Sequence, residues 1–339
     1  MSNQLGWPGL SEGVLDRAQE ILGPRSTLRH PLGPMTTYRV GGPAAIFLKV
    51  ESLRDLAAAS HALADTGLPV LVLGRGSNLL VADAGFPGIA LTLGAEFDGI
   101  ISIMGAGPDE GPDTSEPERR ATGGQSGRVR VGAATYMPVL ARRCAAAGLG
   151  GLEWAAGIPG SVGGGVCMNA GGHGADMKAA LVGAELYDLG TGAQSNVLAG
   201  ELHLGYRQSA ITPSQVVLSA LLAGYGVDPL VSRARIDEIV RWRRANQPGG
   251  SNAGSVFVNP DGNTAGRLVE GAGLKGLRVG SAEVSARHAN FIQAGPGGSA
   301  DDVARLIAEV RRRVADSTGT SLELECRLIG EFVYTSTRG

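Results

Sequence analysis

One run of eighteen residues, 157–174, constrains the fold of this chain most strongly, because it contains eight glycines and almost no charge. Glycine loses more backbone entropy on ordering than any other residue and offers no side chain to pack. We therefore expect neither a stable helix nor an ordinary strand here. Ile158, Val162, Val166 and Met168 argue against a flexible linker. The run predicts a backbone pressed closely against a large ligand, and the size of that ligand points to a cofactor.

Length and composition limit the class of protein. With 339 residues and 43% hydrophobic content, the chain can form two or three domains with buried cores. A formal net charge of -2 and a pI of about 6.2 indicate no electrostatic surface for nucleic acid or an anionic membrane. The sequence has no signal-peptide pattern at its N-terminus and no apolar run of the roughly 20 residues that cross a bilayer. We expect a soluble cytoplasmic protein with no membrane insertion.

The cysteines and histidines predict no metal site. Cys144, Cys167 and Cys326 are widely spaced, odd in number and form no Cys-x-x-Cys pair. They fit neither a disulfide framework nor a zinc site, so we expect reduced, buried thiols. The five histidines have no metal-ligand spacing either. We therefore expect no metal.

Hydrophobic periodicity predicts alternating helices and strands. Helices are expected over residues 53–66, 136–147, 233–246, 265–270 and 300–315, the last with Ser299 as its N-cap. Strands are expected over residues 68–73, 79–82, 88–93, 97–104, 128–133, 181–189, 216–223, 289–293 and 322–329, and around Glu283. Residues 104–127 are rich in Gly, Pro, Ser, Thr and acidic residues and lack aromatics, which predicts a solvent-exposed hairpin insertion.

A second glycine motif, Gly74-Arg75-Gly76-Ser77-Asn78, follows the strand expected over residues 68–73. Glycines let consecutive backbone N–H groups converge on an anion, and Ser77 and Asn78 add side-chain donors for the same phosphate oxygens. The motif is no Rossmann fingerprint, because Leu79 stands where the third glycine belongs and the segment enters a strand. A tight turn without a ligand is the alternative, and the glycine run at residues 157–174 weighs against it.

Further motifs occur in order along residues 36–330. They are Tyr-Arg-Val-Gly-Gly-Pro at 38–43, Gly-Arg-Gly-Ser-Asn at 74–78, Gly-Leu-Glu at 151–153 with Gly-Ile-Pro-Gly-Ser-Val-Gly-Gly at 157–164, Gly-Tyr-Arg at 205–207, Ala-Gly-Ser-Val-Phe at 253–257 with Asn-Pro at 259–260, Ala-Gly-Leu-Lys-Gly at 272–276, His-Ala-Asn-Phe at 288–291, and Leu322-Glu323 with Glu325. Together they resemble the UDP-N-acetylenolpyruvoylglucosamine reductase family over nearly the whole chain.

The resemblance implies an α+β protein with a two-part FAD-binding fold of the vanillyl-alcohol-oxidase type and a C-terminal α/β substrate-binding domain. The first FAD-binding domain would cover residues 1–92, with residues 325–339 returning to it. Residues 93–225, including the insertion at 104–127, would form the second, and residues 226–324 the substrate-binding domain.

The resemblance also implies a reaction of peptidoglycan precursor synthesis. NADPH would reduce a non-covalently bound FAD. The reduced flavin would then reduce the enolpyruvyl double bond of a UDP-sugar, giving UDP-N-acetylmuramate. We expect the UDP-sugar and NADPH as the partners of a monomeric enzyme.

Three residues match the positions that carry the chemistry in this family. Hydride addition leaves negative charge next to a carboxylate, and the fork of Arg207 suits that carboxylate. Ser255 would donate the proton, although an ordinary turn serine is the structural alternative. The alternation of residues 322–326 places Glu323 and Glu325 on one face of the last strand, which is usually just a solvated face. The family pattern instead gives Glu325 a part in protonation and leaves Glu323 structural.

Other matched positions would bind ligands. The FAD-binding residues implied by the resemblance are Gly74, Arg75, Gly76, Ser77, Asn78, Leu79, Ile158, Pro159, Gly160, Ser161, Gly163, Asn169 and Ala170. Their N–H groups would bind the pyrophosphate and their apolar side chains the rings. The substrate-binding residues implied are Tyr206, Asn259, Lys275 and His288, and Lys275 is one of only three lysines in the chain.

The chain departs from the family pattern at three places. Val258 occupies a position where the family carries lysine, and Gly172-His173 stands where Ala-Tyr is usual. The interval between Arg207 and Ser255 leaves no room for the tyrosine-bearing loop of some members, so the chain resembles the type without it. Two alternative functions remain: an FAD-dependent alcohol or sugar oxidase of the same fold, and a non-catalytic nucleotide-binding protein.

Overall fold

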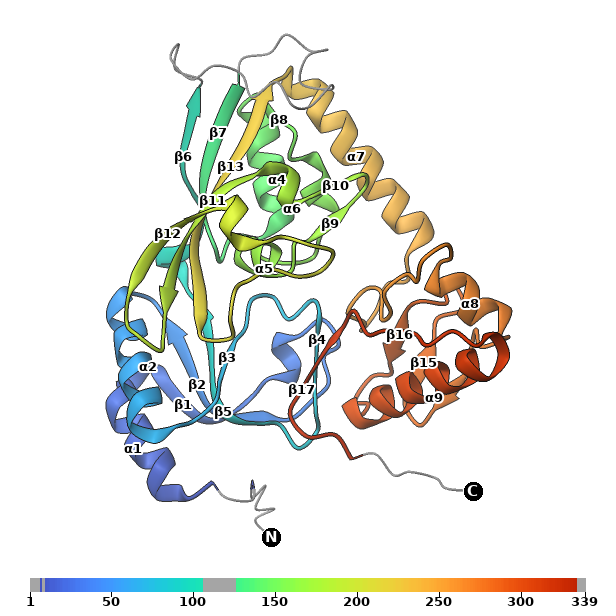
Figure 1. Cartoon of the computed structure of the whole chain (residues 1–339), viewed down its shortest axis with the longest axis horizontal. Helices are drawn as coiled ribbons and strands as arrows, with labels where there is room; N and C mark the ends of the chain where they lie inside the picture. The colour runs from blue at the N-terminus through green and yellow to red at the C-terminus, as the bar shows by residue number, and fades with distance from the viewer. Residues whose placement is uncertain (1–6, 8–9, 106–125, 334–339) are drawn as a thin grey trace. The chain divides into compact units, whose positions relative to one another are not determined.

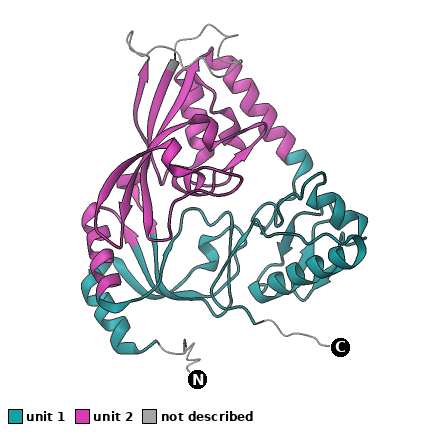
Figure 2. Ribbon diagram, in the orientation of Figure 1, with its two compact units in different colours: residues 1–48, 65–91, 244–339 teal, residues 49–64, 92–243 magenta. Residues whose placement is uncertain are grey.

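The computed structural model describes residue 7 and residues 10–105 and 126–333. The chain divides into two compact units (Figure 2). Unit 1 comprises Met1–Leu48, Asp65–Leu91 and Arg244–Gly339, and unit 2 comprises Lys49–Ala64 and Thr92–Arg243. Within the described ranges, no helix has both the length and the apolar character that crossing a membrane requires.

Unit 1 contains most of the first and last thirds of the chain (Figure 1). Its elements are α1 Glu12–Leu22, η1 Gly23–Arg25, β1 Ser26–Pro31, η2 Gly33–Met35, β2 Pro43–Val50, β3 Val70–Val72, β4 Leu79–Val81, β5 Phe86–Leu93, α8 Ala265–Gly271, β14 Arg278–Val279, β15 Ala282–Val284, β16 Ile292–Ala294, α9 Ala300–Thr318 and β17 Arg327–Ile329. The C-terminal ends of β2 and β5, from Lys49 and Thr92 onward, belong to unit 2.

Three sheets build unit 1. A four-stranded sheet has the order β1-β2-β5-β3, and a three-stranded antiparallel sheet, β14-β15-β16, packs against α9. The last strand, β17, returns to pair in parallel with β4, with Arg327 opposite Leu79. Tyr38, Val40 and Leu80 lie in one buried cluster with residues of α8, α9 and β15. The N-terminal and C-terminal parts of unit 1 therefore share a hydrophobic core.

A carboxylate from the loop after β4 holds the start of α9. Ser299 caps the helix as predicted, because its hydroxyl accepts from the Asp302 N–H. Asp83 in turn accepts from the Ser299 hydroxyl at 2.5 Å, from the Ala300 N–H at 3.0 Å and from the Asp301 N–H at 3.1 Å. Negative charge at a helix N-terminus is favourable, so Asp83 ties α9 to the β4 loop.

Unit 2 contains the middle of the chain. Its elements are α2 Leu53–Thr66, η3 Ala95–Phe97, β6 Ile100–Gly105, β7 Ser126–Gly132, α4 Met137–Ala146, β8 Leu149–Gly150, η4 Glu153–Gly157, α5 Val162–Cys167, β9 Gly171–Gly172, β10 Ala175–Asp176, α6 Met177–Ala180, β11 Leu181–Asp188, β12 Gln194–Leu198, η5 Ala199–Leu202, β13 Gln215–Gly226 and α7 Pro229–Asn246, whose end continues into unit 1.

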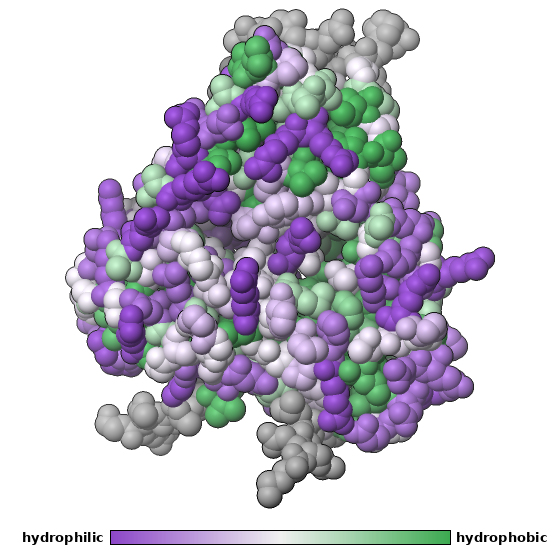
Figure 3. Space-filling model, turned by 180° about the vertical axis from the view of Figure 1, so that it is seen from behind, coloured by the Kyte–Doolittle hydropathy of each residue, from purple (hydrophilic) through white to green (hydrophobic). Residues whose placement is uncertain are grey.

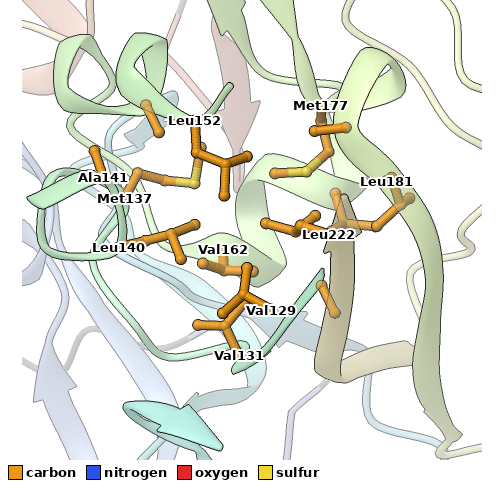
Figure 4. Packing of buried hydrophobic residues seen from close by; sticks show 14 of the residues in the cluster. Val129, Val131, Met137, Leu140, Ala141, Leu152, Val162, Met177, Leu181 and Leu222 are labelled. Atoms are coloured by element: carbon orange, nitrogen blue, oxygen red, sulfur yellow. The ribbon is translucent and has the colours of Figure 1, made fainter. Parts of the chain in front are cut away.

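The six-stranded sheet of unit 2 runs β12-β11-β13-β7-β6, with β8 also paired to β13. Apolar side chains from α4, α5, β7 and β13 point toward one another beside this sheet (Figure 4). Met137, Val129, Val131 and Leu222 are fully buried there. Figure 3 shows apolar residues gathered on one face of the molecule. The exposed Ile101, Ile103 and Met104 lie on the edge strand β6.

The structure confirms most predicted elements. The strand expected over residues 289–293 is only Ile292–Ala294, and the strand expected over 97–104 begins at Ile100. Three further corrections concern α7, the last strand and the glycine run. Helix α2 has the predicted bounds, and β6 and β7 pair antiparallel across the predicted insertion, most of which lies outside the described residues. Helix α7 begins four residues earlier than predicted, at Pro229, a residue suited to the first turn of a helix. The last strand is only Arg327–Ile329, because residues 322–326 pair with the segment at Val256 and Val258 instead.

The third correction concerns the glycine run, where a helix was not expected. Val162–Cys167 forms α5, with Ser161 as its N-cap. A Cβ on Gly163 would lie 2.9 Å from the Cβ of Ala133, and one on Gly165 would lie 3.0 Å from Met177 Cε. The helix therefore forms because glycine permits close packing on the rest of unit 2, which outweighs its entropic cost.

We predict that Asp83→Ala lowers the free energy of unfolding by about 1–2 kcal/mol, because the N–H groups of Ala300 and Asp301 lose their acceptor. Denaturant unfolding followed by circular dichroism measures the change. Asp237→Ala is the control, since Asp237 is exposed on α7, and it should shift the value by less than about 0.5 kcal/mol. Equal stabilities of the two variants would contradict the role of Asp83.

Candidate active site

The turn between β3 and β4 offers a set of backbone donors in unit 1. Gly76 has φ +57°, and a Cβ there would lie 2.6 Å from the Cα of Thr36. The Gly76 carbonyl accepts from the Thr37 N–H at 3.1 Å, which fixes the turn on that neighbouring segment. Within the described part of the chain, the N–H groups of Gly76, Ser77 and Asn78 donate to no protein acceptor. Such consecutive N–H groups can bind a phosphate.

The side chain of Asn78 has a partner that the sequence did not indicate. Its Nδ2 donates to the Glu325 carbonyl at 3.0 Å, and the backbone carbonyl of Asn78 accepts from the Arg327 N–H at 3.0 Å. We expected the side-chain amide of Asn78 to donate to a phosphate. One of its two hydrogens binds the C-terminal segment instead. The phosphate-binding turn and the segment that carries Glu325 are joined directly. Gly74 and Arg75 are exposed, and Leu79 is half-buried at the start of β4.

The N-terminus of α5 in unit 2 is largely committed to protein contacts. The Val162 N–H donates to Thr135, the Gly163 N–H donates to the Ala133 carbonyl at 2.9 Å, and the Gly164 N–H donates to the Ser161 hydroxyl. These three N–H groups already have protein acceptors, and the implied role of Gly163 in FAD binding stays a prediction.

Other residues of the glycine run remain accessible for a ring system. Ile158, Pro159 and Ala170 are half-buried, whereas Gly160 and Ser161 are buried. A Cβ on Gly157 would lie 2.8 Å from the ring of His173. His173 contacts Trp242 edge-on at 5.1 Å, and burial lowers the pKa of its imidazole. The replacement of the family's tyrosine by His173 thus puts a neutral ring against this run.

Asn169 braces the turn that carries Arg207. It is 4% exposed and has φ +40°. Its Nδ2 donates to Asp176 at 3.0 Å and to the Gly205 carbonyl at 2.9 Å, and its Oδ1 accepts from the Lys178 N–H at 2.8 Å. These bonds use both amide hydrogens. The Asn169 side chain therefore holds protein segments together, and only its backbone is left for FAD.

Arg207 has a constrained conformation in unit 2. Its φ of +54° is uncommon for a residue other than glycine and is maintained only when surrounding structure imposes it. Its guanidinium lies over the Tyr206 ring, 5.2 Å from the centroid, and donates to the Gly171 carbonyl at 3.3 Å. Tyr206 is 59% exposed. The pair presents a cation beside an accessible aromatic ring.

Ser255 and Glu325 lie on neighbouring extended segments of unit 1. The Glu325 N–H donates to the Val256 carbonyl at 2.8 Å, and the Val258 N–H donates to the Glu323 carbonyl at 2.9 Å. Ser255 and Glu325 are half-buried, whereas Glu323 is exposed. Glu325 therefore precedes the last strand rather than lying on it, and the backbone pairing places it beside the serine segment.

The thiol next to Glu325 does not compete as an acid. Cys326 is 3% exposed, and burial raises the pKa of its thiol to about 12, with the neighbouring Glu325 carboxylate as a further cause. Cys144 is buried in unit 2, and burial likewise raises its pKa to about 12. Cys167 is half-buried.

The predicted substrate-binding residues of unit 1 already have protein partners. Lys275 Nζ lies 2.7 Å from Glu270 Oε1, and Asn259 Oδ1 accepts from the Ala265 N–H at 3.0 Å. His288 Nδ1 accepts from the Asn290 N–H at 3.2 Å. Burial lowers the pKa of His288, and because Nδ1 accepts a hydrogen bond, the neutral ring carries its proton on Nε2. The imidazole is thus a neutral donor.

Sequence reasoning assigned no role to Asn290, and it missed Thr36 and Thr37, which support the Gly76 turn. Asn290 belongs to the His-Ala-Asn-Phe motif at residues 288–291, so the motif was the available signal. The described ranges hold no group of three or more Asp, Glu, His or Cys residues arranged to bind a metal.

In unit 1, the N–H groups of Gly76, Ser77 and Asn78 suit the oxygens of a phosphate or pyrophosphate. In unit 2, Ile158, Pro159 and Ala170 suit the flat apolar surface of a ring system. The first donor set follows a strand and enters a strand, so the fold is not the Rossmann type. Fold and residues together define an FAD-binding flavoprotein. A family profile described as "FAD binding domain" matches residues 44–197.

Comparison with known proteins gives the family. The profile "UDP-N-acetylenolpyruvoylglucosamine reductase, C-terminal domain" matches residues 246–329. The reductase of that name from Syntrophotalea carbinolica is 39% identical over 316 residues, covering 93% of this chain and 98% of its own. The one from Rubrobacter xylanophilus is 38% identical, covering 95% and 100%. The chain belongs to the UDP-N-acetylenolpyruvoylglucosamine reductase family.

A solved structure agrees. The crystal structure of UDP-N-acetylenolpyruvylglucosamine reductase from Thermus caldophilus has 36% sequence identity and a TM-score of 0.71, and covers 90% of this chain and 98% of its own. The chain is therefore an FAD-dependent oxidoreductase with the α+β fold of this family.

We predict that Gly76→Ala weakens FAD binding at least tenfold, about 1.4 kcal/mol, because a Cβ at 2.6 Å from the Thr36 Cα forces the turn to move. Titration of the apoprotein with FAD, followed by flavin fluorescence, measures the affinity. Gly67→Ala is the matched control, since Gly67 has φ +67° with nothing within 4 Å of its Cβ position. An unchanged FAD affinity for Gly76→Ala would show that the turn does not bind the cofactor.

Proposed function

We propose that this chain catalyses the NADPH-dependent reduction of UDP-N-acetylglucosamine enolpyruvate to UDP-N-acetylmuramate, a step of peptidoglycan precursor synthesis. The observation that carries the proposal is the pairing of the Ser255 and Glu325 segments through the Glu325 N–H and the Val256 carbonyl at 2.8 Å. A reductase of this type needs a proton donor, and the pairing keeps a hydroxyl and a carboxylate on adjacent segments. Membership of the reductase family supports the same reaction.

When bound, FAD supplies the hydride that adds to the methylene carbon of the enolpyruvyl group. Negative charge then develops on the neighbouring carbon and its carboxylate. We assign Arg207 to that carboxylate, because a permanently charged guanidinium can form two parallel hydrogen bonds with it. One well-placed donor to a developing oxyanion contributes about 2.7–4 kcal/mol. The bond to Gly171 and the Tyr206 ring hold the guanidinium before substrate binds.

Ser255 would give its hydroxyl proton to the carbon that carries the ether oxygen. The alcohol is a weak acid, and the accepting carbon is basic enough to take the proton from it. Glu325 would assist by hydrogen bonding and by stabilising the charge. Positioned proton transfer contributes about 10²–10⁴-fold to a rate.

The substrate-binding residues would act on the sugar nucleotide. His288, neutral with its proton on Nε2, would donate to a phosphate or sugar oxygen without adding charge. Lys275 would supply the positive charge that Val258 does not, Asn259 would bind through its amide nitrogen, and Tyr206 would offer its accessible ring.

We further propose a monomeric enzyme of the cytoplasm that inserts into no membrane. Its three predicted domains, residues 1–92 with 325–339, residues 93–225, and residues 226–324, would carry the FAD-binding and substrate-binding functions. The structure divides the chain into two compact units, and the division into three domains is our proposal.

We predict that Ser255→Ala leaves the reduction of bound flavin by NADPH within about twofold and slows flavin reoxidation by the enolpyruvyl sugar nucleotide by about 10²–10⁴-fold. Anaerobic stopped-flow absorbance at the flavin band measures both steps. Ser317→Ala on the exposed face of α9 is the control and should change neither step. Normal reoxidation in Ser255→Ala would exclude Ser255 as the proton donor, and failure of the sugar nucleotide to reoxidise the native enzyme would contradict the proposed reaction.

A further inference from the structure

Asn290 is a buried polar residue between two parts of the proposed site. It is 4% exposed and lies in the loop that leads into β16. It uses all its backbone and side-chain polar groups. The Val256 N–H donates to the Asn290 carbonyl at 2.9 Å, and the Asn290 N–H donates to His288 Nδ1 at 3.2 Å. The backbone of Asn290 therefore contacts the serine segment on one side and the predicted substrate-binding imidazole on the other.

The side chain of Asn290 adds a second pair of bonds to the serine segment. The Phe257 N–H donates to Asn290 Oδ1 at 2.9 Å, and Asn290 Nδ2 donates to the Phe257 carbonyl at 2.8 Å. The planar amide thus pairs with Phe257 as a residue of a neighbouring strand would. The reverse amide orientation would place donor against donor and acceptor against acceptor, so the geometry has one solution.

These bonds fix the segment that begins at Ser255. Asn290 lies on one side of residues 256 and 257, and the backbone of Glu323 and Glu325 lies on the other. Gly254, directly before Ser255, has φ +78°, a conformation that can change easily unless the following residues are held. The surrounding cluster is apolar, with Ala253, Val256 and Phe257 buried. An apolar side chain would fill the space, but it would leave the N–H and carbonyl of Phe257 unpaired.

Two other asparagines use their side-chain amides in a similar way. Asn78 Nδ2 donates to the Glu325 carbonyl, and Asn169 Nδ2 donates to the Gly205 carbonyl in the Arg207 turn. Each predicted catalytic residue therefore lies on a segment that a side-chain amide holds. Asn290 differs from the other two because its side-chain amide pairs with both the N–H and the carbonyl of one residue, Phe257.

We propose that Asn290 is a positioning residue that acts through Ser255: its amide sets the place of the hydroxyl, and its N–H sets the tautomer of His288. This inference rests on the proposed function. Asn290 touches no reacting atom in it. Asn290 keeps the Ser255 hydroxyl and the His288 imidazole in fixed positions. A single residue therefore couples substrate binding to protonation.

The decisive experiment is a double-mutant cycle between Asn290 and Ser255. Asn290→Asp keeps an acceptor for the Phe257 N–H but places a carboxylate oxygen, in place of the Nδ2 donor, against the Phe257 carbonyl. Asn290→Leu removes both bonds without adding a charge. We expect each variant to slow flavin reoxidation by the enolpyruvyl sugar nucleotide by about 10–100-fold, within the range of positioned proton transfer. Flavin reduction by NADPH should stay within about twofold. In the Ser255→Ala background the same substitutions should slow reoxidation less than about threefold, because the group they position is gone.

Gln293→Leu is the control. It removes the hydrogen bond of 2.8 Å from Gln293 Nε2 to the carbonyl of Gly249, which precedes Ser255 in the chain, and it should change neither half-reaction. Full additivity with Ser255→Ala, or equal loss in both half-reactions, would make Asn290 a merely structural residue and overturn the inference. Failure of both variants to fold and bind FAD would overturn it too. If the native enzyme does not reduce the enolpyruvyl sugar nucleotide, the proposed function and this inference are both overturned. If the native enzyme is active and both Asn290 variants react at the native rate, only this inference is overturned.

Discussion

Close approach of backbone segments at glycine is the constraint on which both units depend. In unit 1, Gly76 lies so near Thr36 that no Cβ fits, and this contact shapes the turn that offers its N–H groups to a phosphate. In unit 2, Gly163 lies against Ala133, and this contact seats α5 on the core. In unit 2, the chain that follows α5 carries Asn169, Ala170, Tyr206 and Arg207 of the predicted site. The glycine-rich segments that pack the scaffold are therefore the same segments that we propose for cofactor binding.

Side-chain amides then connect these segments to the residues proposed for catalysis. Asn78 holds the Glu325 segment, Asn169 holds the Arg207 turn, and Asn290 holds the Ser255 segment. A side-chain amide can bond to a backbone carbonyl without the regular ladder of a sheet, so it can order loops whose sequence suits no strand. Loops ordered in this way can place polar groups toward a ligand while a rigid core carries them.

Sequence reasoning reached the family, the cofactor and most helices and strands, because glycine motifs and hydrophobic periodicity are local signals. It failed where tertiary contacts decide. The helix at Val162–Cys167 forms against the propensity of its glycines, since unit 2 packs around it. The segment at 322–326 alternates like a strand but pairs with Val256 and Val258 outside any regular sheet. The roles of Asn78, Asn169 and Asn290 depend on partners 33–247 residues away, and no local pattern identifies those partners.

In the proposed reaction, the enolpyruvyl double bond is reduced with a proton from a group that exchanges with solvent. This can be tested by anaerobic reaction of the enzyme with NADPH and the enolpyruvyl sugar nucleotide in D₂O, followed by NMR of the product. We expect UDP-N-acetylmuramate with deuterium on the lactyl carbon that carries the ether oxygen. NADPH oxidation with the double bond left intact, or product without deuterium at that carbon, would contradict it.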